Sequence, residues 1–175
     1  MNRVRRRTYG ATLVEVALAI GIAGVFLAVF VPTFVRELRV RKLDEPVEML
    51  AAMEARVVAH YAESKSARGC LPPASGPVPA TPHAQPFTAD FSDANPAAMG
   101  FRIIGFAPNR PLRFRYSMTP STEACPAPVG ARIELVAEGN LDQDGQHSRF
   151  TRALVVDAHR ELRALAPLRV ERATE

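Results

Sequence analysis

The chain has 175 residues, of which 47% are hydrophobic, and a formal net charge of +4. This length leaves room for about one domain of ordinary size beside a leader or an anchor. Four arginines and no acid occur in residues 1–10, so without them the 22 basic side chains fall to 18, equal to the 18 acidic ones. The positive charge belongs to the N-terminus and gives no argument for a nucleic-acid-binding protein.

A long apolar segment follows these arginines. Residues 11–35 contain one charged side chain, Glu15, and are long enough to cross a bilayer as a helix. Gly21, Gly24 and Pro32 lie inside the segment, where a membrane helix tolerates them. We therefore expect a membrane-spanning helix over 11–35.

The helical pattern continues beyond the apolar segment. Within residues 36–66 the sequence is polar but keeps one apolar stripe at spacings of three, four and seven, formed by Leu43, Val47, Leu50, Val57 and Tyr61. This pattern predicts that the helix runs to about Glu63 and places one face against a head domain.

The remainder of the chain predicts a β-rich head. Six prolines between Pro72 and Pro86 favour a loop without regular structure over 67–98. Within 99–175, four segments have strand character, at 101–106, 112–118, 132–137 and 150–156. The tail after Ala158 predicts either a short edge strand or no regular structure. The expected fold class is α+β, a long N-terminal helix packed on an antiparallel sheet of about four strands.

The chain has two cysteines, Cys70 and Cys125, with no metal-binding or redox spacing around them. We interpret them as one disulfide between the end of the long helix and the loop between the second and third predicted strands. Such a bond requires their Cα atoms to lie within about 7 Å and persists in an oxidising compartment. Two unrelated buried thiols are the alternative.

The segment Gly10-Ala11-Thr12-Leu13-Val14-Glu15-Val16, behind a short arginine-rich leader and before the apolar run, resembles the cleavage and methylation motif of type IV prepilins and type II secretion pseudopilins. Resemblance in this motif covers residues 5–35. Many members of the family begin the mature chain with phenylalanine or methionine, whereas this one would begin with Ala11. Pro32 stands where many type IV pilins have a helix-kinking proline.

The resemblance implies several roles. Residues 1–10 would be a leader that prepilin peptidase removes between Gly10 and Ala11, and Ala11 would be N-methylated. Glu15 would pair with the N-terminal amine of a neighbouring subunit, with Pro32 also serving assembly. The protein would insert once into the inner membrane with a periplasmic head, and then join a pilus or periplasmic pseudopilus made of pilin subunits. A signal anchor with an incidental glutamate and a cleavable secretory signal peptide are the alternatives.

The loop Asn140–Gly145 has oxygen donors at Asn140, Asp142 and Asp144. It resembles the opening of a calcium loop, and some pseudopilins bind calcium in a head loop, but Thr151 stands where the bidentate glutamate of an EF-hand should be. A plain turn explains the same residues and is preferred. No cofactor is required by this interpretation, and calcium is the one candidate.

No pattern in the head predicts catalysis. The four histidines have no recurrent spacing, so we expect no catalytic residue and no enzyme. Four arginines near two aromatic residues could form a DNA-binding strip, although a solvated strand face is the preferred interpretation: Arg102, Arg110, Arg113, Arg115, Phe114 and Tyr116. The sequence is thus compatible with three functions: a filament subunit, a subunit whose head binds DNA or a surface, and a single-pass membrane protein with an independent head.

Overall fold

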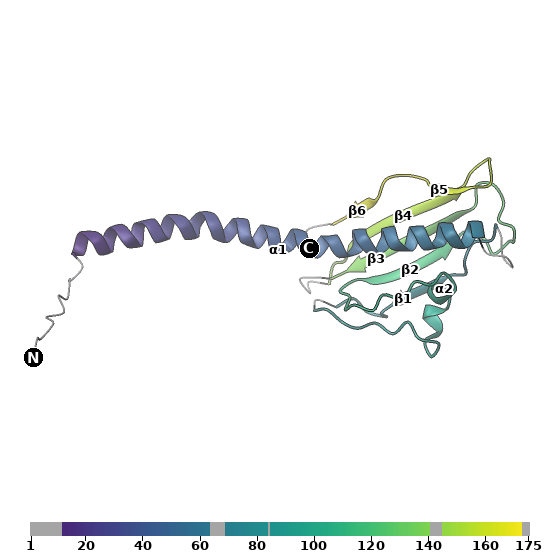
Figure 1. Cartoon of the computed structure of the whole chain (residues 1–175), viewed down its shortest axis with the longest axis horizontal. Helices are drawn as coiled ribbons and strands as arrows, with labels where there is room; N and C mark the ends of the chain where they lie inside the picture. Colours follow the sequence, from purple (N-terminus) through teal and green to yellow (C-terminus); the bar gives the residue numbers. More distant parts are fainter. Residues whose placement is uncertain (1–11, 64–68, 84, 141–144, 173–175) are drawn as a thin grey trace, which may run out of the picture. The chain divides into compact units, whose positions relative to one another are not determined.

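The computed structural model describes residues 12–63, 69–83, 85–140 and 145–172 (Figure 1). The chain divides into two compact units, Met1–Arg41 and Lys42–Glu175. One helix, α1 (Leu13–Glu63), contributes residues to both units. Its end at Glu63 is the end that the sequence predicts.

The second unit is built on a six-stranded antiparallel sheet. Its strands follow the order β1-β2-β3-β4-β5, and β6 also pairs with β4. In chain order they are β1 (Ser75–Val78), β2 (Arg115–Pro120), β3 (Arg132–Gly139), β4 (Ser148–Val156), β5 (Leu162–Ala164) and β6 (Arg169–Glu171). Two short helical elements, η1 (Pro96–Ala98) and α2 (Met99–Ile103), lie between β1 and β2 in the chain.

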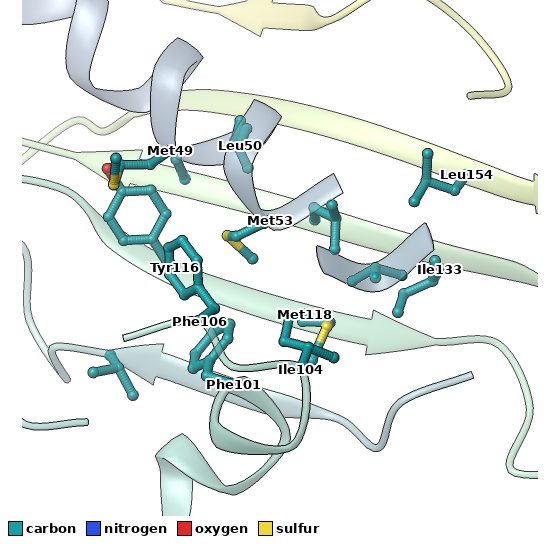
Figure 2. Close-up of a cluster of buried hydrophobic side chains, with 14 of the residues drawn as sticks. Met49, Leu50, Met53, Phe101, Ile104, Phe106, Tyr116, Met118, Ile133 and Leu154 are labelled. Atoms are coloured by element: carbon teal, nitrogen blue, oxygen red, sulfur yellow. The ribbon is translucent and has the colours of Figure 1, made fainter. Parts of the chain in front are cut away.

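Alternating side chains of β2, β3 and β4 build the core together with one face of α1. Met49, Leu50 and Met53 of the helix lie among strand residues such as Tyr116 and Ile133 (Figure 2). The observed helical stripe differs in part from the predicted one, because Leu50, Val57 and Tyr61 are buried but Val47 is 47% exposed. Met49 and Met53 occupy the face instead, at helical spacing from Leu50 and Val57.

Glu45 fixes the helix to the start of β2. Its Oε1 accepts hydrogen bonds from the backbone N–H groups of Arg113 and Phe114, at 2.9 and 3.1 Å, and from the hydroxyl of Tyr116 at 3.2 Å. Half-buried amides that reach no sheet partner would otherwise cost free energy. One carboxylate oxygen thus satisfies three donors and sets the position of the helix along the sheet.

Tyr116 gives the fold a dependence on alkaline pH. Burial, and next the charge of Glu45, raise the pKa of Tyr116 above its ordinary value near 10. The native phenol stays neutral where the unfolded one ionises, so stability is complete below pH 10 and falls above it by about 1.4 kcal/mol per pH unit. We expect Tyr116→Phe to remove this part of the decline, while it costs about 1 kcal/mol at pH 8 for the lost hydrogen bond. Urea unfolding of both proteins between pH 8 and 11 measures the difference, and parallel pH profiles would contradict it.

The other face of the sheet carries basic and acidic side chains that alternate from one strand to the next. Arg115 on β2 binds Glu138 on β3 at 2.7 Å, and Arg149 on β4 binds the same carboxylate at 2.9 Å. Glu171 on β6 stands opposite Arg149 in the register. Opposite charges on directly paired strands stabilise the chosen register modestly.

Two predictions about the head are wrong. Segment 101–106 is not a strand, because Met99–Ile103 form α2 and the chain turns at Ile104 and Gly105. Segment 67–98 is not free of regular structure, because it contains β1 and η1. Strands at 132–137 and 150–156 are confirmed with small extensions, that at 112–118 is shifted to Arg115–Pro120, and the tail adds two short strands.

Candidate membrane-spanning segment

The segment Leu13–Val31 of α1 is long and apolar enough to cross a membrane. None of its side chains is buried, which distinguishes it from the core helix of a soluble domain. Large apolar side chains such as Leu13, Leu18 and Phe30 expose more than half of their surface. An exposed apolar surface of this extent is typical of a segment that contacts lipid or other chains.

A capping box begins this helix. Thr12 is the N-cap residue, and its carbonyl accepts the first helical hydrogen bond from Val16 N at 3.1 Å. The Glu15 carboxylate accepts from Thr12 N at 2.8 Å and from Thr12 Oγ1 at 3.0 Å, while Glu15 N donates to Thr12 Oγ1 at 3.3 Å. This reciprocal pairing of a threonine with a glutamate three residues later satisfies donors that the first helical turn leaves open.

The capping box gives Glu15 a local structural role beside the pairing role that the sequence motif implies. The spacing Thr12-x-x-Glu15 is a recognised signal for a helix start, so the sequence did contain it. The carboxylate also favours the positive end of the helix dipole. The described residues use two of the hydrogen bonds that this carboxylate can accept, and an ionised carboxylate accepts about four.

The other residues that the sequence assigns to this end are described to different extents. Gly10 and Ala11 lie outside the described residues. The backbone of Pro32 lies within α1, which runs on through it. Glycines 21 and 24 have open space around them, with no atom within 4 Å of where a Cβ would stand, so neither is required by packing inside this chain.

A disulfide joins Cys70 and Cys125 in the head, with their Cα atoms 4.8 Å apart. The predicted pairing is confirmed, and its geometric limit is met. Cys125 lies between β2 and β3, also as expected. Hydrogen bonds reinforce the tie, because Gly69 N donates to Tyr61 O at 2.9 Å and Ala127 N donates to Gly69 O at 2.7 Å.

The loop Asn140–Gly145, for which a plain turn is preferred and calcium is the alternative, is described only at its edges. Asp142 and Asp144 lie outside the described residues, while Asn140 is half-buried and its Oδ1 has no hydrogen-bond partner among the residues that the structure describes. Among the described residues, no group of three or more histidine, cysteine, aspartate or glutamate side chains is placed to hold a metal ion.

The structure does not assemble the basic and aromatic strip, which is the less favoured interpretation of these residues. Phe114 and Tyr116 are fully buried, so neither can stack on a base. Three of the four arginines have carboxylate partners, since Arg102 binds Asp93, Arg110 binds Glu48 and Arg115 binds Glu138. The buried Nε of Arg113 has no hydrogen-bond partner among the described residues.

No family model, no curated protein and no solved structure matched this chain in the comparisons.

Proposed function

We propose that the chain is a structural subunit of a type IV pilus or of a pilus-like pseudopilus, which is cut between Gly10 and Ala11 and assembles through the first part of α1. The observation that carries this proposal is the exposed apolar segment Leu13–Val31, which has one carboxylate, Glu15, in its first turn. The α+β arrangement of the head and its disulfide agree with a secreted filament subunit.

The physical case starts from the cost of the carboxylate. A charged side chain in a membrane-spanning helix is unfavourable unless it has a partner, so it selects the neighbour that supplies one. After the cut, the amine of Ala11 in an adjacent subunit is a cation at the matching depth. The pairing of that amine with Glu15 would fix the axial register of helices whose remaining side chains are apolar and pack without direction.

The decisive experiment is an intact mass of the protein isolated from membranes. A filament subunit loses residues 1–10 and gains one N-terminal methyl group, whereas a single-pass membrane protein with an independent head keeps the full chain. Purified filaments would then show whether the chain is incorporated. An intact leader in membrane-inserted protein would overturn the proposal.

Glu15→Ala should leave cleavage unchanged and reduce incorporation into filaments at least tenfold, because the peptidase site and the pairing site are different groups. Immunoblotting of sheared filaments against total membrane protein measures the ratio. Loss of the helix cap could produce the same defect, so Thr12→Ala is the matched control. It removes the Thr12 hydroxyl from the capping box but keeps the carboxylate.

The two variants separate pairing from capping. A cap of this kind is worth about 1 kcal/mol, which should reduce assembly only slightly in Thr12→Ala. Glu15→Gln should behave like Glu15→Ala, because an amide retains hydrogen bonds but has no charge to attract the amine. Equal defects in Thr12→Ala and Glu15→Ala would instead assign Glu15 to capping alone.

A further inference from the structure

A cavity of about 760 Å³ opens at the disulfide end of the head. Its walls come from the last turns of α1, from the residues beside each cysteine, Gly69 and Pro126, and from the β4–β5 hairpin at 159–163. The apolar part of the lining includes Val58, Tyr61 and Leu162, the last two of which are almost fully buried. This volume is in the range of pockets that bind small organic ligands, and the cavity is open to solvent on one side.

The hairpin that forms one wall is held rigidly. The Asp157 carboxylate accepts hydrogen bonds from His159 N at 2.8 Å and from Glu161 N at 2.9 Å. Backbone hydrogen bonds close the same turn, from Asp157 N to Glu161 O at 2.9 Å and from Arg160 N to Asp157 O at 3.0 Å. The bonds to its carboxylate, first the one from Glu161, hold the pKa of Asp157 below its ordinary value. The wall is therefore formed before any ligand arrives.

Arg160 is the unusual residue of this turn. Its φ is +60°, a left-handed conformation that glycine adopts without strain and other residues adopt at a cost. A turn selected for stability alone would have glycine or asparagine here. Residues held in such a conformation are concentrated at functional sites, where the side chain is needed in one place.

Of the two arginines that the structure places in the cavity lining, only Arg163 has carboxylate partners among the described residues. Arg163 is occupied, because it binds Glu161 and also Asp157 at 3.2 Å. Arg160, in contrast, lines the cavity with an exposed side chain and has no carboxylate partner in the part of the chain that the structure describes. An apolar floor below one unpaired guanidinium fits a ligand that has an apolar body and one negative group.

We propose that this cavity binds an organic carboxylate with an apolar body, with Arg160 contacting the carboxylate and the surface of Val58, Tyr61 and Leu162 contacting the apolar group. The ligand would be either a free small acid or the carboxylate end of a peptide, since both present the same chemistry. This inference does not depend on the proposed filament function, because every residue in it belongs to the head.

The test uses the full chain in lipid nanodiscs, with empty nanodiscs as the blank. Saturation-transfer NMR compares phenylacetate with phenylacetamide, which has the same apolar body without the charge. We expect phenylacetate to bind about fivefold more tightly, the size expected for one exposed charged contact. A second pair, N-acetyl-Gly-Phe with a free or an amidated end, identifies a chain end as the source if its acid binds more tightly than phenylacetate.

Arg160→Asn is the matched variant, because asparagine tolerates the left-handed conformation and keeps the turn. Its unfolding midpoint should be unchanged or up to about 4 °C higher, while its preference for phenylacetate over the amide disappears. Arg160→Lys should retain part of that preference. Equal binding of acid and amide by the natural protein, an unchanged preference in Arg160→Asn, or no binding of either acid at millimolar concentration would each overturn the proposal.

Discussion

Replacing both Cys70 and Cys125 by serine should lower the free energy of unfolding of the head by about 4 kcal/mol. The disulfide closes a loop with a sequence separation of 55 residues, and the loss of chain entropy in the unfolded state scales with that length. Neither cysteine lies in a helix or a strand, so the surrounding backbone has few hydrogen bonds to replace the tie. Typical domains are stable by about 5–15 kcal/mol, which makes this the largest single contribution that we assign.

Denaturation by urea, followed by circular dichroism on the full chain in micelles, measures the effect. The natural protein under reducing conditions is the control, and it should match the double variant. Removal of the proposed leader should be unchanged in the variant, because the proposed cut lies at the other end of the chain. A loss below about 1 kcal/mol would show that the bond is not a major source of stability.

Gly10→Leu should abolish removal of the leader and leave the precursor in the membrane. Glycine has no Cβ, so its peptide bond is accessible and its backbone can be drawn into an extended conformation in a peptidase site. A leucine side chain next to the proposed scissile bond removes both properties. Expression of a C-terminally tagged chain, followed by immunoblotting and intact mass, should show the precursor alone.

Gly21→Leu is the matched control for this experiment. It makes the same substitution in the nearby apolar helix, at a glycine with nothing within 4 Å of an added Cβ. Processing of Gly21→Leu should remain complete. Mature protein at its usual level in Gly10→Leu would place the cut elsewhere or show that no cut occurs.

Sequence patterns predicted the elements that have a clear period. The apolar run and the stripe ending at Tyr61 indicated the helix to Glu63, and the strand-like segments 132–137 and 150–156 indicated β3 and β4. The prediction of a strand at 101–106 was wrong because a buried helix as short as α2 shows no measurable helical period. Phe101 and Phe106 both face Phe91 there, with ring centroids 5.7 and 5.9 Å away. The aromatic and β-branched residues of this segment favour a strand by propensity. Tertiary packing of these rings overrides that propensity and gives a helix.

Strand β1 was missed for a different reason. Pro77 lies inside it and Gly76 has a φ of +92°, both of which argue against a strand. A proline is acceptable in an edge strand, because the side of that strand that faces away from the sheet needs no backbone N–H donor, and proline has none. The order β1-β2-β3-β4-β5 places β1 at that edge. Sequence alone gives no information on which strand will be outermost.

The candidate sites also divide into those that the sequence reveals and those that it does not. Glu15 and the two cysteines could be found because each is rare in its surroundings or in the chain. The cavity could not, because its walls come from segments about 100 residues apart in sequence, Val58 and Arg163 for example. The left-handed backbone of Arg160 is also invisible in a sequence, since a residue other than glycine gives no signal of a positive φ.

The capping box at Thr12 and Glu15 determines the state of the Glu15 carboxylate before another chain binds it. In the filament subunit that we propose, the carboxylate is already bonded to its own first turn, at 2.8 and 3.0 Å, so its charge is partly satisfied before a neighbour arrives. Assembly by the proposed pairing is then an exchange of partners, in which the gain is the difference between an ammonium ion and the groups of Thr12. Under this proposal, a new partner is favoured only where it binds the Glu15 carboxylate better than Thr12 does, which disfavours association with a helix that presents no cation.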